Sequence, residues 1–178
     1  MFWKRKRDRN SGFKCPTCGK DHAGWPALAF KSPANYDFLS EREKSELGKL
    51  DADFCEIRYT DQTDRFIRVT LTQKVIGVCE GLDYGLWVSL SEESYADYKA
   101  NFDNPSHENR YFGWLCSNIP EYESTLSIPC DVQTRFGNSR PEIIPHADFD
   151  HPFVKDYYSG IPLQEAEKRI ADMMDRVG

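Results

Sequence analysis

The chain has 178 residues, of which 39% are hydrophobic, 13% aromatic and 29% charged, and its formal net charge at pH 7 is −6. This length and apolar content are enough for one globular domain, and no apolar run reaches the ~20 residues that a membrane helix needs. The basic N-terminus is followed by no apolar stretch and is not a secretion signal, so we expect a cytoplasmic protein with no membrane contact.

Positive charge is concentrated in residues 1–10, which contain five Lys or Arg residues and one Asp. The whole chain has 23 basic and 29 acidic residues, so the remainder has 18 and 28 and a net charge of −10. We expect residues 1–12 to form a flexible basic tail. The acidic body argues against a nucleic-acid-binding domain and fits a basic partner, although the tail itself is a candidate for contact with nucleic acid.

The most specific motif is Cys15-Pro16-Thr17-Cys18, which opens a knuckle expected over residues 13–24. Two thiolates at this spacing, with a glycine after the second, can hold one zinc ion while backbone amides face the sulfurs. His22 is close enough in sequence to be a third ligand. A redox Cys-x-x-Cys pair is the alternative, but such pairs usually lie between a strand and a helix, whereas a stretch rich in proline and glycine follows this one.

The fourth zinc ligand has to be an isolated residue, because no second Cys-x-x-Cys pair follows. Cys55 is the first choice, and Cys116 and His151 are the alternatives. The predicted site for one zinc ion therefore consists of Cys15, Cys18, His22 and Cys55. Three disulfides among the six cysteines would need an oxidising compartment, for which the sequence carries no export signal.

Most of the remaining chain has the pattern of strands and helices around one sheet. Capping-box spacing of Ser40 and Glu43 predicts a helix over 41–49, and Ser91 is the expected cap of a helix whose Tyr95, Tyr98 and Phe102 lie on the sheet. Apolar alternation and β-branched residues predict a hairpin of 53–59 with 65–73, a central strand at 84–90, strands at 111–116 and 125–136, and a short edge strand at 140–145.

The C-terminal part is predicted to be helical. Asp150-His151-Pro152 supplies an N-cap and a proline for a short helix, and a final helix begins near Leu163. Strands grouped in the middle, with helices before, between and after them, predict an α+β domain over 13–178. We expect a central antiparallel sheet flanked by helices, with the zinc-knuckle-like turn at its N-terminal end.

Aromatic residues in the predicted strands and one histidine are candidates for a functional site. Trp87, Tyr111 and Trp114 are candidates for a partner pocket, although aromatic residues in strands more often belong to the core. His151 is either a base or a helix-capping residue. No Gly-x-Ser-x-Gly, phosphate loop or His-Glu-x-x-His motif is present, so no catalytic residue is assigned.

Several blocks of the sequence resemble one bacterial family, known as domain of unknown function 2199. They are Cys15-Pro-x-Cys18-Gly-x-x-His22, the block 85–92, the block 111–115, the region of Leu126, and Asp150-His151-Pro152. The resemblance extends from about Cys15 to Ile161. It implies a compact bacterial cytoplasmic protein, and it supplies no catalytic residues.

The sequence favours a non-catalytic, metal-stabilised module that binds another protein. An acidic domain without catalytic motifs is suited to the role of an immunity protein, which neutralises a bacterial toxin by covering a basic surface. The alternative is a metal-dependent enzyme, in which Cys15, Cys18 and a histidine leave one zinc position open for water.

Overall fold

The computed structural model describes residues 13–14, 21–22 and 24–177. The predicted tail over 1–12 and the cysteines Cys15 and Cys18 lie outside these residues. The strands are β1 Phe13–Lys14, β2 Asp21–His22, β3 Leu28–Ala29, β4 Gly48–Leu50, β5 Phe54–Arg58, β6 Thr63–Gln73, β7 Leu82–Leu90, β8 Arg110–Leu115, β9 Pro129–Arg135 and β10 Ser139–Pro145. The helices are α1 Ala34–Asp37, α2 Glu41–Leu47, α3 Glu92–Ala100, α4 Pro152–Ser159 and α5 Leu163–Val177.

The larger sheet closes into a barrel of five strands. Its order is β3-β7-β8-β9-β10-β6-β5-β4, and β6 also pairs with β7, so that β6, β7, β8, β9 and β10 form a ring. Most pairs are antiparallel, as expected, but β3 with β7 and β10 with β6 are parallel. The α+β class is therefore confirmed, while the central sheet is closed rather than open.

The helix predicted over 41–49 ends at Leu47, and residues 48 and 49 belong to β4. Closure of the barrel explains why the predicted edge strand is not at an edge. The segment 140–145 was predicted as an edge strand, but β10 pairs with β9 on one side and meets β6 on the other, where Glu142 lies opposite Thr70. The prediction was wrong because this parallel contact joins segments about 70 residues apart. Strand β7 is central, as predicted, with β3, β6 and β8 as its neighbours.

The inward residues of the barrel strands form the main core. Side chains alternate along a strand, so one set faces the barrel interior. The fully buried members of this set are Ile67, Val69, Leu71, Leu82, Leu86, Val88, Leu115, Cys130, Val132 and Ile143. A second, smaller cluster lies on the outer face of β5, β6 and β7, and consists of Cys55, Ile57, Phe66, Trp87 and Cys116.

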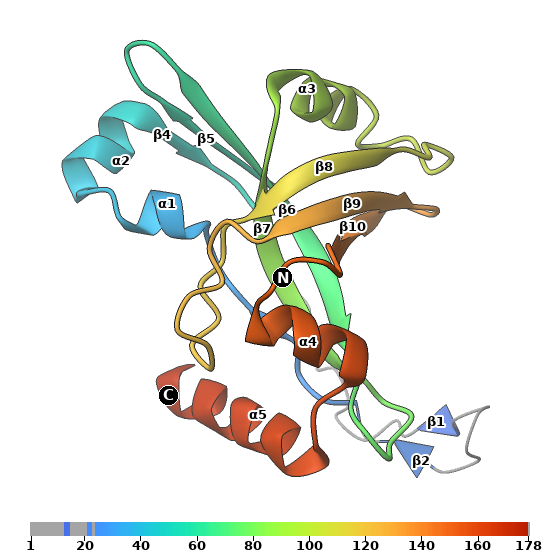
Figure 1. Cartoon of the computed structure of the whole chain (residues 1–178). Helices are drawn as coiled ribbons and strands as arrows, with labels where there is room; N and C mark the ends of the chain where they lie inside the picture. The colour runs from blue at the N-terminus through green and yellow to red at the C-terminus, as the bar shows by residue number, and fades with distance from the viewer. Residues whose placement is uncertain (1–12, 15–20, 23, 178) are drawn as a thin grey trace, which may run out of the picture.

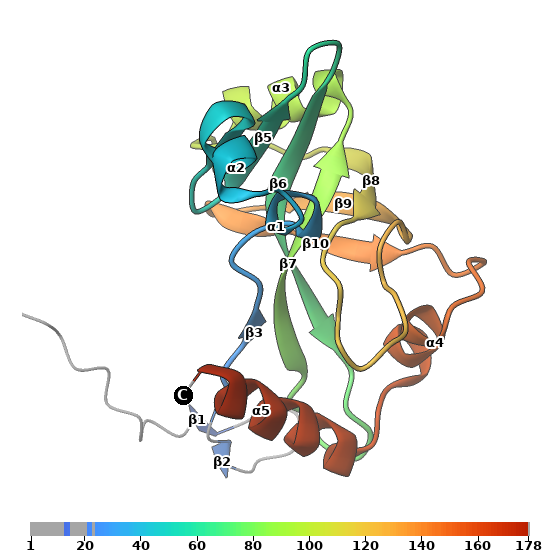
Figure 2. The same cartoon turned by 90° about the vertical axis from the view of Figure 1, so that its left-hand side faces the viewer.

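The helices cover different parts of the barrel (Figures 1 and 2). α3 lies at one end and α4 and α5 at the other, and α1 and α2 lie beside β4 and β5. The predicted caps are largely confirmed: Ser40 and Glu43 form a capping box, and Ser91 caps α3. In α4 the cap is His151, whose Nδ1 accepts a hydrogen bond of 3.0 Å from the backbone N–H of Phe153.

The last helix, α5, packs on the core through Ala166, Ile170 and Met173 and also contributes one buried arginine. Arg169 is 3% exposed, and its Nε donates to Glu165 Oε1 at 2.8 Å within the helix. Its two other nitrogens donate to the hydroxyls of Tyr84, on β7, and Tyr122, at 3.2 and 3.0 Å. Because each of the three guanidinium nitrogens donates to an acceptor, this charge is buried with hydrogen-bond partners on every nitrogen.

Candidate functional site

The outer face of β8 carries an exposed pair of aromatic rings. Tyr111 and Leu115 are buried in the core, whereas Phe112 and Trp114 point outward and are each 46% exposed. The two outward rings meet edge to face, with centroids 5.0 Å apart. This contact orients both rings, so the strand presents them to solvent as one apolar unit.

A hollow of about 500 Å³ lies beside this pair. Trp114 lines it together with Phe38, from the segment between α1 and α2, and Leu126, from the connection between β8 and β9. Phe38 is 75% exposed, which makes it the most exposed large apolar side chain among the described residues. We name the four residues Phe38, Phe112, Trp114 and Leu126 the aromatic surface. Contiguous exposed apolar groups of this kind are typical of protein interaction sites.

The charges beside the aromatic surface leave one carboxylate available. Arg65 lines the hollow but is paired with Glu92, with 2.9 Å between Nη2 and Oε1. Asp64 lines the same hollow and forms no ion pair with another described residue; its Oδ1 accepts a hydrogen bond of 3.1 Å from Gln62. The hollow therefore combines an exposed indole ring with an available carboxylate, and both attract a cationic side chain.

A second carboxylate lies next to Phe112 but is already engaged. Asp131, opposite Phe112 on β9, forms an ion pair with Arg110, and its Oδ1 lies 3.4 Å from Nε2 of His146. Burial acts to raise the pKa of Asp131, but the hydrogen bonds from Arg110 and His146 outweigh it and hold the pKa below its ordinary value. The His146 ring also contacts Phe112, with centroids 5.6 Å apart. Arg110, Asp131 and His146 therefore hold one another in place beside Phe112, on the side of the aromatic surface away from the hollow.

The structure separates the aromatic residues that the sequence grouped together. Trp87 and Tyr111 belong to the core, at 0% and 5% exposure, and Trp114 does not. The phase of alternation in the segment 111–115 carried this signal: if Tyr111 and Leu115 face the core, Trp114 faces away from it. The exposure of Phe38 could not have been predicted from alternation, because Phe38 lies outside the strands. It follows α1, which has only four residues and is too short to show a helical pattern.

The described part of the chain contains only some of the predicted zinc ligands. The side chain of His22 lies outside it, like Cys15 and Cys18; the backbone of His22 pairs with that of Phe13. Cys55 is 0% exposed in the smaller core cluster, where burial raises its pKa to about 12. Zinc binds the thiolate, so this environment does not favour Cys55 as a ligand.

The two alternative ligands also have structural roles. Cys116 is 7% exposed and its Sγ donates to the carbonyl of Trp114 at 3.3 Å, while His151 caps α4. Among residues 24–176, whose side chains are described, no three His, Cys, Asp or Glu residues lie close enough together to hold a metal ion. The predicted site at Cys15, Cys18 and His22 lies outside that range and stays a prediction.

Fold and surface together define an α+β protein with a small closed barrel and one exposed aromatic surface. The chain belongs to the family described as "Uncharacterized protein conserved in bacteria (DUF2199)", whose sequence profile matches residues 14–161. No curated protein and no solved structure gives a significant match to the chain. Within the described residues, no helix is long and apolar enough to cross a membrane.

Proposed function

We propose that this chain is a non-catalytic module that binds another protein through the aromatic surface. The observation that carries the proposal is the exposure of Trp114 and Phe112 on β8, beside the hollow that Phe38 lines. Tryptophan is among the residues that contribute most binding energy at protein interfaces, where the rings become buried and surrounding contacts exclude water. An isolated chain exposes such residues together at a cost in solubility, which a partner would remove.

The proposed partner is a basic protein domain. Without its first ten residues, the chain has a net charge of −10, which favours encounter with a positively charged surface. Within the hollow, a partner's Arg or Lys side chain would lie against Trp114 and pair with Asp64. A bacterial toxin neutralised by an immunity protein is the specific case that we propose. It requires complementary shape and charge, and no chemistry.

The first prediction concerns Trp114. We expect Trp114→Ala to weaken binding to the toxin domain encoded beside this gene by at least 30-fold, which corresponds to about 2 kcal/mol, a typical value for a dominant interface residue. Asp64→Asn should weaken binding less, and more strongly at low salt than at high salt. Isothermal titration calorimetry with the purified toxin domain measures both effects.

The matched control for this prediction is Phe136→Ala. Phe136 is 63% exposed, but it lies in the turn between β9 and β10 and does not line the hollow. It should leave the affinity unchanged. A gene neighbourhood that encodes no basic toxin-like domain would rule out the role of an immunity protein. An affinity that Trp114→Ala and Phe38→Ala leave intact would rule out the proposed interface.

We also propose that Cys15, Cys18 and His22 hold a structural zinc ion. Support comes from the Cys-x-x-Cys spacing and from the antiparallel pairing of β1 with β2 on either side of this motif. The second prediction is that the purified chain contains about one zinc per molecule. Elemental analysis should detect this ion, and a Cys15→Ser/Cys18→Ser variant should lose it and melt at a lower temperature, because a structural metal contributes folding energy.

The same measurement distinguishes the alternative function. A metal-dependent enzyme with an open zinc position would lose a reaction on chelation while its melting temperature stayed the same. If the chain contains no metal and the double variant melts like the unchanged protein, both metal proposals fail. The protein-binding proposal rests on the aromatic surface and is tested separately by Trp114→Ala.

A further inference from the structure

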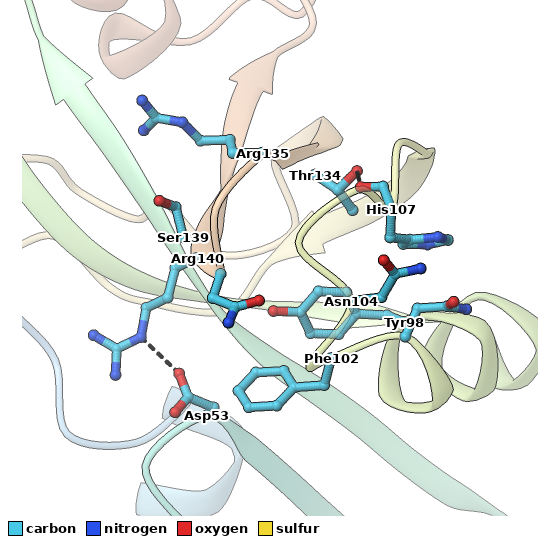
Figure 3. Close-up of a pocket in the computed structure, with 11 residues that line it drawn as sticks. Asp53, Tyr98, Phe102, Asn104, His107, Thr134, Arg135, Ser139 and Arg140 are labelled. Atoms are coloured by element: carbon cyan, nitrogen blue, oxygen red, sulfur yellow. Dashed lines mark hydrogen bonds and ion pairs between the residues drawn. The ribbon is translucent and has the colours of Figure 1, made fainter.

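A polar pocket of about 340 Å³ lies where the end of α3 meets the turn between β9 and β10 (Figure 3). Tyr98 and Phe102 line it from α3 and the following loop, and Arg135 and Arg140 line it from β9 and β10. His107, which precedes β8, also lines this pocket, whereas Trp114 near the end of β8 lines the hollow of the aromatic surface. The two hollows therefore lie toward opposite ends of β8.

The pocket is positively charged although the chain is acidic. Its only carboxylate among the lining residues is Asp53, whose Oδ1 accepts a hydrogen bond of 2.6 Å from Arg140 Nε. Arg135 forms no ion pair with any described residue and is exposed. This excess of guanidinium groups favours an anionic ligand.

One hydroxyl that faces the pocket has no hydrogen-bond partner among the described residues. Tyr98 is 7% exposed, and its hydroxyl points into the pocket, away from the helix that carries it (Figure 3). No described residue forms a hydrogen bond with this hydroxyl, although the hydroxyls of the nearby Tyr95 and Tyr111 both do. Burial, with a further contribution from the charge of Asp53, raises the pKa of Tyr98 to about 12, so the hydroxyl remains a donor at neutral pH. This donor is available to a ligand's oxygen.

An aromatic ring forms another part of the lining. Phe102 is 37% exposed, and its ring is held in place by Phe54 and Tyr98, with centroid distances of 5.0 and 5.9 Å. A ring fixed in this way offers a flat apolar surface on which a planar group can stack. The side-chain amides of Asn104 and Asn138, which also line the pocket, supply both donors and acceptors for polar atoms at the edge of such a group.

We infer that this pocket binds a small phosphate monoester that carries a planar ring, the chemistry of a nucleoside 5′-monophosphate. The phosphate oxygens accept hydrogen bonds from the Tyr98 hydroxyl and the ring lies against Phe102. The exposed side chain of Arg135, which points away from Tyr98 in Figure 3, turns toward the phosphate when the ligand binds. The volume is at the lower end of the range for small-ligand sites, which suits one nucleotide and excludes a long chain. This site is independent of the proposed partner and lies away from the aromatic surface.

Calorimetric titration of the full chain tests the inference with the four ribonucleoside 5′-monophosphates, their nucleosides and inorganic phosphate. At least one monophosphate should bind tenfold more tightly than both its own nucleoside and inorganic phosphate. Tyr98→Phe keeps the ring packing and removes only the hydroxyl, and it should weaken that binding by about tenfold. Arg135→Ala should weaken it by at least tenfold.

Two controls separate the pocket from general effects. Arg42→Ala removes an exposed arginine on α2 that lies outside the pocket, and it should leave the affinity unchanged, as should Trp114→Ala. Thermal melting shows that each variant is folded. No binding of any monophosphate, or binding that survives both Tyr98→Phe and Arg135→Ala, would overturn the site. If inorganic phosphate binds as tightly as every monophosphate, the proposed stacking of the ligand's ring on Phe102 is wrong.

Discussion

Replacing Trp87 with alanine is expected to lower the free energy of unfolding by roughly 3–5 kcal/mol, the range for removing a fully buried large aromatic side chain. Trp87 is 0% exposed and is the largest member of the smaller core cluster. Its Nε1 donates to the carbonyl of Phe30 at 3.0 Å, and the guanidinium of Arg68 lies 5.9 Å from its ring centre. Alanine would leave a cavity, an unsatisfied carbonyl and an uncovered guanidinium.

Urea unfolding followed by circular dichroism measures this effect, and Trp114→Ala is the matched control. Trp114 lies on an adjacent strand but is 46% exposed, so its replacement should change the free energy of unfolding by less than about 1 kcal/mol. Domains of this size are stable by only about 5–15 kcal/mol, so Trp87→Ala should be close to the limit of folding. Equal losses from the two tryptophan variants would contradict the assignment of Trp87 to a core.

The second large effect concerns Glu56 and pH. Glu56 is 8% exposed on β5 and joins the strand to α3 through Tyr95 and Lys99, whose donors lie 3.0 and 3.1 Å from Oε1. Arg58 donates to the other oxygen at 2.7 Å. Burial acts to raise the pKa of Glu56, but these three donors together lower it from 4.5 to about 2. The carboxylate is therefore bound more favourably than the protonated acid.

Because the folded-state pKa lies below the unfolded value, Glu56 contributes stability that is complete above about pH 4.5 and is lost as the pH falls toward 2. The lowered pKa corresponds to roughly 3 kcal/mol, and the partial exposure of Arg58 and Lys99 reduces this to about 2 kcal/mol. Glu56→Gln should remove that amount at pH 7. The difference between the variant and the unchanged protein should disappear near pH 2.

Chemical unfolding at a series of pH values checks this prediction. Glu108→Gln is a suitable control, because Glu108 is exposed in the loop before β8 and should contribute little at any pH. A constant difference between Glu56→Gln and the unchanged protein from pH 7 to pH 2 would show that the variant acts through packing and not through the charge of the carboxylate.

Local signals in the sequence were sufficient where neighbouring residues determine the structure. The capping box at Ser40 and Glu43 and the cap at Ser91 depend on contacts three residues apart, and both helix starts were predicted correctly. The hairpin of β5 and β6 joins adjacent segments, and its pairing was also predicted. The stripe of Tyr95 and Tyr98 lies on the sheet as expected, but α3 ends at Ala100, so Phe102 packs on Phe54 from outside the helix.

The candidate sites depended on contacts that no local pattern contains. The hollow at Trp114 is completed by Phe38, 76 residues away in the chain, and the pocket at Tyr98 is completed by the turn between β9 and β10. The spacing of residues along the chain does not show which distant residues lie close together in space. Cys55 shows the same point: its apolar strand indicated burial, but its position beside Trp87 of β7 is a contact between distant segments.

The sequence by itself determined the α+β class, most helix starts, the central position of β7 and the acidic body, because propensity, capping and alternation act over a few residues. The tertiary structure alone decided that β10 closes a barrel instead of ending a sheet. It also decided that Trp87, which points outward from the barrel as Trp114 does, is buried under residues of α1 and α2 while Trp114 stays exposed. The first outcome follows from which distant strands pair. The second follows from which outward-facing residues a distant segment of the chain covers.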